Sequence, residues 1–228
     1  RSNRGGTLEA YEIASYHSKS VFNQKGRSYM ERVCVFIDGS NFYFGLKRNN
    51  RVTRVDYYQL SLALAGPDRN LVRTYYYNVA YDKELFPDKA KTQISFLDSL
   101  DKTPHLELRL GRLYSTSDGR VHEKGIDILI ASDLVYHAAR KTFDTAIVVT
   151  EDGIYSSALE NVKDLGLHVE IATFQDNQNR ELMRAADIRI PLDSVLNQYS
   201  SKIFPLDLDD NLGNTVERVG RVQKSFTK

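Results

Sequence analysis

The sequence predicts an α/β fold in which helices cover both faces of a mostly parallel, doubly wound sheet. Short apolar segments alternate with helical segments from residue 33 to residue 191, as is typical of parallel strands joined by helical crossovers. Two of these segments, 33–37 and 146–150, are almost wholly apolar, which is expected of central strands buried on both faces. With 228 residues, the chain is long enough for one sizeable domain of this kind with extensions.

Caps, stops and apolar spacing place each element. Asp56 is suited to cap a helix that ends at Gly66 and Pro67, and Gly166 is suited to end another. Leucines that alternate with Glu107 and Arg109 predict a half-buried strand. The expected strands are 33–37, 71–79, 106–110, 146–150, 169–172 and 188–191, and the expected helices are 57–65, 88–101, 126–139, 156–165 and 180–186.

Changes in composition divide the chain into three parts. Residues 1–31 form a polar N-terminal arm with a weak helical patch at 8–13, and residues 32–196 form the folded domain. Residues 197–228 are a linker with clustered acids followed by a basic tail. That tail suits contact with a phosphate backbone, although a solvated tail is the commoner case.

Charge and cysteine usage narrow the class of protein. The net charge is +1, so attraction to nucleic acid has to come from local patches. Cys34 is the only cysteine and has no partner for an intramolecular disulfide, which indicates a reducing compartment such as the cytoplasm. We expect no membrane association, because the longest apolar runs are too short to span a bilayer. Neither a glycine-rich nucleotide loop nor a GxSxG motif is present.

Acidic residues stand where the predicted strands end. Asp38 follows the strand 33–37, Asp152 follows the strand 146–150, and Asp127 begins the helix 126–139. Each acid alone equally fits a turn or a helix cap. Because ligands of such folds bind at the carboxyl ends of the strands, the three acids together predict an all-oxygen site for Mg²⁺ or Mn²⁺.

Three segments carry a resemblance to a known family. FIDGSNFYFGLK, EKGIDILIASDLVYHA and TAIVVTEDGIYSSALENVKDLGLHVEIA resemble the NYN family of PIN-like domains, in particular its LabA-like branch, over residues 32–195. The resemblance implies a three-layer α/β/α PIN-like, Rossmann-like sandwich and a metal-dependent ribonuclease site. Asp38 and Asn41 fall on the DGxN motif of the family, Asp127 on KGxD, and Asp152 on the first acid of SGDxDF.

One position departs from the family pattern. The second acid of SGDxDF is Ile154 in this chain, so one metal-binding carboxylate of the family is missing. Glu151 is the neighbouring acid that would compensate for it. The departure puts two-metal chemistry, and catalysis itself, in question.

The expected roles of the site residues follow from these motifs. Asp38, Asp127 and Asp152 would hold the metal, and Asn41 would either position water or phosphate or cap the next helix. Ser40 and Lys124 would contact substrate, although an exposed lysine is the commoner case. Glu151, Asp133 and Asp187 would support the metal ligands, with a turn role favoured for Asp187.

Two further groups are open to two interpretations. Asp133 lies about 9 Å along the helix from Asp127, too far to share an ion, and is expected to be buried and hydrogen-bonded, with His137 on the same face. The run Tyr75 to Tyr77 offers stacking surfaces for RNA bases, although at least one ring must face the core.

Three functions are consistent with the sequence. The favoured one is a metal-dependent ribonuclease, a hydrolase of RNA phosphodiester bonds. The alternative is a catalytically weak NYN protein that binds RNA or regulates partners, and Ile154 favours it. The third is a homo-oligomeric structural domain.

Overall fold

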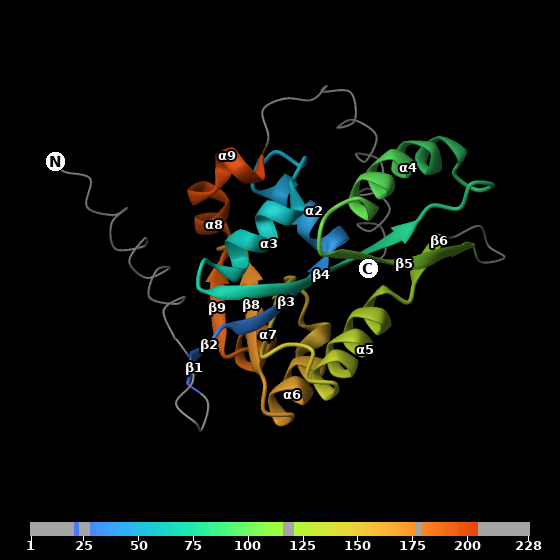
Figure 1. The fold of residues 1–228 in the computed structure, drawn as a ribbon. Helices are drawn as coiled ribbons and strands as arrows, with labels where there is room; N and C mark the ends of the chain where they lie inside the picture. Colours follow the sequence, from blue (N-terminus) through green and yellow to red (C-terminus); the bar gives the residue numbers. More distant parts are fainter. Residues whose placement is uncertain (1–20, 23–27, 116–120, 177–178, 205–228) are drawn as a thin grey trace.

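Figure 1 shows the protein as a computed structural model that describes residues 21–22, 28–115, 121–176 and 179–204. The described residues form a seven-stranded sheet in the order β6-β5-β4-β3-β7-β8-β9 and a separate antiparallel pair, β1 (Val21–Phe22) and β2 (Ser28–Tyr29). Within the large sheet, only β6 runs antiparallel to its neighbour. The strands are β3 (Glu31–Asp38), β4 (Arg69–Ala80), β5 (Leu106–Ser115), β6 (Val121–Lys124), β7 (Thr145–Val149), β8 (His168–Thr173) and β9 (Ile188–Pro191).

Helices cover both faces of this sheet and complete a three-layer α/β/α arrangement (Figure 1). One face packs against α2 (Gly39–Arg48), α3 (Tyr57–Ala65), α4 (Pro87–Asp101), α8 (Leu192–Gln198) and α9 (Ser200–Ile203). The other packs against α5 (Ile126–Ala139), the 3-10 turn η1 (Gly153–Tyr155), α6 (Ser156–Asp164) and α7 (Arg180–Ala185). Side chains of β3 alternate between the two cores, as the pleat of a strand requires. The predicted fold class is confirmed.

Every predicted helix and strand is present, and most of the differences lie at the ends of elements. The prediction omits α2, because Gly39 and Gly45 are poor helix formers. The structure gives a packing reason for Gly45, since a Cβ there would come within 2.4 Å of the Phe174 ring. The side chain of Asp38 caps α2 by accepting the Asn41 N–H. A strand-end acid therefore also starts a helix.

The folded domain continues past its predicted end at residue 196. Ile203 in α9 is fully buried in the first core, and its carbonyl accepts the Asp56 N–H at 2.8 Å. The segment was expected to be a linker because it is mostly polar, but it contains the end of α8 and the short helix α9. The predicted helical patch at 8–13 and the basic tail at 218–228 lie outside the described residues.

The tyrosines of β4 are core residues. Tyr75, Tyr76 and Tyr77 are 5%, 2% and 0% exposed. The expectation that they offer stacking surfaces for bases is wrong, because β4 is a central strand with both faces covered.

In the part of the chain that the structure describes, no helix combines the length and the apolar character needed to cross a bilayer.

Candidate active site

The candidate site lies at the carboxyl ends of β3 and β7, where the strand order of the sheet reverses direction. From β3 the chain adds β4 and β5 on one side, and later places β7 on the other side. Open α/β sheets bind their ligands at the carboxyl ends of strands beside such a switch. Asp38 is the last residue of β3, and Thr150, Glu151 and Asp152 follow β7 directly.

Two of the three predicted acids meet at this point. The hydroxyl oxygen of Tyr155 lies 3.0 Å from Oδ2 of Asp38 and 3.2 Å from Oδ1 of Asp127. Two carboxylates from different elements, the end of β3 and the first turn of α5, therefore converge on one atom. Asp38 and Asp127 are called the acid pair below.

The acid pair lies in an environment that disfavours negative charge. Asp38 is 8% exposed, and burial is the main reason that its pKa is raised from 3.8 to about 6. The charges of Asp127 and Asp152 act in the same direction, whereas hydrogen bonds from Asn41 and Tyr155 oppose them. Burial, followed by the charges of the acid pair, raises the pKa of Tyr155 far above its ordinary value. The phenol therefore keeps its proton at neutral pH and acts as a donor.

The backbone at the start of α5, two residues before Asp127, favours a glycine at position 125. Gly125 has φ +93° and forms the N-cap of α5, and this left-handed conformation is strained for residues with a side chain. The buried residues Ile126 and Ile130 fix the rotation of α5 against the sheet. Asp127 then occupies the first turn, where the helix dipole favours a carboxylate.

The acid pair has the chemistry of a small divalent-cation site. Carboxylate oxygens are preferred ligands of Mg²⁺ and Mn²⁺, and Mg²⁺ commonly uses one or two carboxylates with waters and substrate phosphates. Asp38 and Asp127 fit this pattern because their oxygens approach one point. No group of three or more Asp, Glu, His or Cys side chains suited to a metal ion occurs among the described residues.

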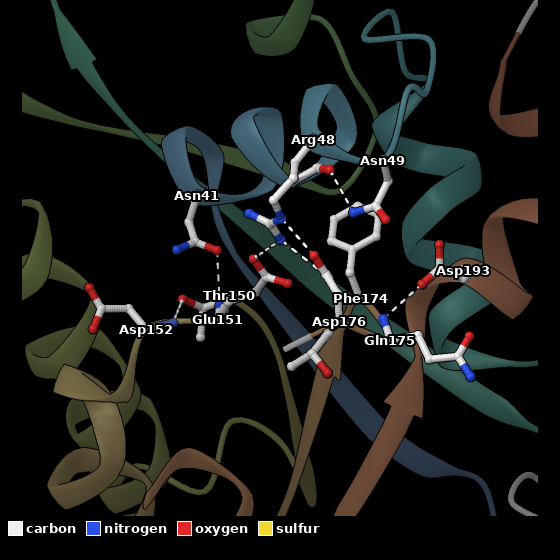
Figure 2. Close-up of polar contacts among 12 residues, drawn as sticks. Asn41, Arg48, Asn49, Thr150, Glu151, Asp152, Phe174, Gln175, Asp176 and Asp193 are labelled. Atoms are coloured by element: carbon white, nitrogen blue, oxygen red, sulfur yellow. Dashed lines mark hydrogen bonds and ion pairs between the residues drawn. The ribbon is translucent and has the colours of Figure 1, made fainter. Parts of the chain in front are cut away.

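Asp152 lies at the same edge but outside the acid pair. Its N–H donates to Oγ1 of Thr150 at 3.2 Å, and its Oδ1 accepts the N–H of Ile154 at 3.0 Å. Figure 2 shows its carboxylate directed away from that of Glu151. The Asp152 charge is still close enough to raise the pKa of Asp38. The structure thus brings two of the predicted ligands together and leaves the third beside them.

Glu151 is engaged with Arg48 (Figure 2). Oε2 of Glu151 lies 2.5 Å from Nη2 of Arg48, whose Nε donates to Oδ2 of Asp176 at 2.7 Å. Arg48 therefore joins the last turn of α2 to the segments after β7 and β8, and the hydrogen bonds that it donates to Asp176 and Glu151 raise its pKa. Oε1 of Glu151 is buried without a hydrogen-bond partner among the described residues. In this arrangement, Glu151 does not replace the missing carboxylate.

Asn41 connects α2 to the loop after β7. Its Oδ1 accepts the N–H of Glu151 at 2.9 Å (Figure 2), so its side chain does not cap α2. Ser40 is half-buried in the first turn of α2, two residues after Asp38. Lys124 is the last residue of β6, and its side chain lies outside the description. The substrate contacts expected of Ser40 and Lys124 stay predictions.

Asp133 has the hydrogen bonds that were expected of it. It accepts the Tyr77 hydroxyl at 2.9 Å and Nε of Arg109 at 3.3 Å, and its side chain is 21% exposed. Its burial is therefore partial. His137 stacks on Tyr75, with ring centroids 4.6 Å apart.

Asp187 lies beside the amino-terminal ends of β8 and β9, whereas Asp38 lies at the carboxyl end of β3. It directly precedes β9, and its Oδ2 accepts the N–H of Val169 at the start of β8. Lys163 and His168 contact the same carboxylate, at 3.5 Å and 3.1 Å. This placement agrees with the turn role and separates Asp187 from the acid pair that it was expected to support.

Two residues of the site were missed from sequence. Arg48 carried no signal, because a basic residue at the end of a helix is common. Tyr155 occupies the aromatic position that ends the SGDxDF motif, which indicates a core residue, and its ring is indeed buried. A sequence pattern cannot show that the orientation of the ring carries its hydroxyl to both acids.

Comparisons with known proteins agree with this architecture. A crystal structure of a protein of unknown function, VPA0982 from Vibrio parahaemolyticus, is similar with a TM-score of 0.59 and 21% identity, covering 74% of this chain and 97% of that one. At that identity it supports the fold alone. A candidate oxidoreductase from Parabacteroides merdae, at 12% identity, covers 74% of this chain and 29% of its own, and its TM-score of 0.29 is too low to carry an argument. No curated protein sequence matches the chain.

The family comparison covers almost all of the large sheet, together with Asp38, Asp127 and Asp152. Residues 32–193 match the family described as NYN domain, which includes the predicted DGxN, KGxD and SGDxDF positions. The matched range begins in β3 and ends in α8, so it spans most of the three-layer fold. The chain therefore belongs to the NYN domain family, within the PIN-like nuclease superfamily.

Proposed function

We propose that the protein is a ribonuclease that hydrolyses RNA phosphodiester bonds with a bound Mg²⁺ or Mn²⁺. The observation that supports this most is the acid pair, whose carboxylate oxygens lie 3.0 Å and 3.2 Å from one point at the switch of the sheet. We also propose that the protein belongs to the LabA-like branch of the family, on the basis of its motifs, and that it acts in the cytoplasm, on the basis of its single cysteine.

Each residue of the site would have a distinct role in binding the cation or the RNA. Asp38 and Asp127 hold the cation, which supplies charge neutralisation at the phosphate and an activated water when bound. Asp38 is fixed for this role by the strand that carries it and by the Asn41 N–H that it accepts at 3.1 Å. Asn41 fixes the loop after β7, and Ser40 and Lys124 contact the RNA phosphates. Asp152 adds a nearby negative charge.

The experiment that tests this function measures cleavage of mixed RNA by the pure protein with Mn²⁺, with Mg²⁺ and with EDTA. We expect metal-dependent cleavage that falls about 100-fold or more in Asp127→Asn, because a lost cation ligand removes several kcal/mol of transition-state stabilisation. Asp98→Asn, which changes an exposed acid on α4, is the matched control and should cleave like wild type. Equal rates in wild type and Asp127→Asn would rule out the acid pair as the active site.

The alternative is a catalytically weak NYN protein that binds RNA or regulates a partner. It is favoured by Ile154, which stands where the family motif has an acid, and by the separation of Asp152 from the acid pair.

Ile154→Asp separates the two functions. Ile154 is 60% exposed, so we expect a change in folding free energy within about 0.5 kcal/mol. If a missing carboxylate limits activity, the variant should cleave RNA faster than wild type in Mn²⁺. A folded variant with no gain would exclude that explanation of weak activity.

A further inference from the structure

We propose that the hydroxyl of Tyr155 competes with the divalent cation for the acid pair, and so sets how tightly the site binds metal. This inference rests on the proposed function in one respect, that Asp38 and Asp127 are the cation ligands. It concerns metal affinity and not the rate of cleavage.

The position of the hydroxyl is fixed by its surroundings. Tyr155 is 1% exposed, and its ring belongs to the second core with residues of α5 and α6. The turn that carries it is also packed closely, since a Cβ on Gly153 would lie 2.5 Å from Nδ2 of Asn179. The ring therefore cannot leave without disturbing the core, and the hydroxyl stays between the carboxylates when no cation is bound.

One hydroxyl proton cannot satisfy both members of the acid pair. The oxygen of Tyr155 lies 3.0 Å from one carboxylate oxygen and 3.2 Å from the other, but it can donate to only one of them at a time. Its lone pairs then face the second carboxylate. The contact to that second oxygen needs a further positive charge or proton, which is a reason for a cation to enter here.

A cation that uses the same two oxygens needs the space that the hydroxyl occupies. Mg²⁺ binds oxygen ligands at about 2.0–2.1 Å, shorter than either contact to the phenol. Binding therefore requires that the hydrogen bond from Tyr155 be given up. Without the hydroxyl, two like charges would face each other with no donor between them, and opposite charge would be favoured more strongly.

The test compares Tyr155→Phe with wild type. Phenylalanine keeps the buried ring and removes only the oxygen. We expect the dissociation constant for Mn²⁺, from titration of the thermal unfolding midpoint and from calorimetry, to fall at least about 10-fold, because a hydrogen bond to a charged group contributes about that factor or more.

Tyr77→Phe is the matched control. It also removes the hydroxyl of a buried tyrosine that donates to an acid, Asp133 at 2.9 Å, but outside the acid pair. We expect its Mn²⁺ affinity to equal that of wild type. Asp127→Asn should abolish the metal effect in both the wild-type and the Tyr155→Phe backgrounds.

A second measurement uses the wild-type protein itself. The chain has no tryptophan, so its near-ultraviolet circular dichroism reports mainly on tyrosine. Saturating Mg²⁺ should change that signal in wild type and in Tyr77→Phe, and the change should be largely lost in Tyr155→Phe.

The outcomes separate this inference from the proposed function. A Tyr155→Phe variant that binds Mn²⁺ as weakly as wild type, or more weakly, would overturn the competition, and weaker binding would mean that the hydroxyl is itself a ligand. Absence of metal binding in every variant would overturn it as well. Tighter Mn²⁺ binding without any RNA cleavage would support the competition and remove the ribonuclease function.

Discussion

The Asp38→Asn variant is expected to unfold at a higher temperature than the wild-type protein at neutral pH, while losing any metal-dependent cleavage. Asp38 is buried, and its pKa in the folded protein is raised from 3.8 to about 6. A raised pKa of a carboxyl group means that the fold favours the protonated form. That shift corresponds to about 3 kcal/mol between the two protonation states, which is the upper limit of the expected gain.

The direction of the pH dependence follows from the same shift. Well below pH 3.8 the Asp38 carboxyl is protonated in both the folded and the unfolded protein, so it does not lower the free energy of unfolding. As the pH rises through about 6, the folded protein must bear a buried charge, and the stability that came from the protonated form is lost. The advantage of Asp38→Asn should therefore grow from about pH 4 to a plateau above about pH 6.

Asparagine can reproduce the local hydrogen bonds. It is as good an N-cap as aspartate, so α2 keeps its cap at the Asn41 N–H. Its amide can donate to the oxygen of Tyr155, which is then free to donate to Asp127.

Thermal unfolding in EDTA at a series of pH values measures this effect. Asp98→Asn, an exposed acid on α4, is the control and should show no pH-dependent difference from wild type. If the Asp38→Asn variant were less stable than wild type at pH 7 and equally so at pH 5, Asp38 would be a structural residue and not a functional acid held at a cost in stability.

The fold could be predicted from the sequence because its strands have unusually simple patterns. The segments around Val35 and Ile147 are continuous apolar runs, and such runs are stable in a sheet only with helices on both faces. The edge of the sheet at which Asp38 lies follows from that arrangement alone, since all parallel strands end at one edge. Asp127 was expected near Asp38 from its place at the start of the predicted helix 126–139, and the structure places a carboxylate oxygen of each near the Tyr155 hydroxyl.

The remaining features depend on contacts between distant residues. The position of the Tyr155 hydroxyl depends on how η1 packs between α5 and α7, which no local pattern encodes. The Tyr75 to Tyr77 run could not be assigned to the core without knowing that β4 is central. Asp187 was expected near the site because its sequence position was used without its place in the sheet, and it precedes a parallel strand whereas Asp38 and Asp152 stand at the ends of two parallel strands.

The Glu170→Ala variant is expected to lose about 3–5 kcal/mol of folding free energy, because it leaves a buried arginine without its main partner. Arg69 and Glu170 lie on β4 and β8 and are each 5% exposed in their side chains. They form two hydrogen bonds, at 2.8 Å and 3.2 Å. For a chain of this size, such a loss lowers the unfolding temperature by about 6–20 °C.

The arginine cannot escape to solvent when Glu170 is removed. Its Nε donates to the carbonyl of Ala65 at 2.6 Å, and Nη2 donates to that of Leu64 at 3.1 Å, which holds the guanidinium under the end of α3. Among the described residues, Glu31 at 3.9 Å is the remaining acid in contact with Arg69, and it also accepts the Thr145 hydroxyl. One distant acid offsets only part of the cost of the buried charge.

Two variants test whether the cost arises from the unpaired charge. Glu107→Ala removes an acid that pairs with Arg73 at 3.4 Å and with Arg109 at 3.6 Å. All three side chains are more than a third exposed, so the change should cost no more than about 1 kcal/mol. The double variant Arg69→Met/Glu170→Leu removes both charges and should recover most of the loss, because apolar residues can replace a buried ion pair. If the double variant were as unstable as Glu170→Ala, the hydrogen bonds from Arg69 to α3, and not the pairing of charges, would be what stabilises this edge of the sheet.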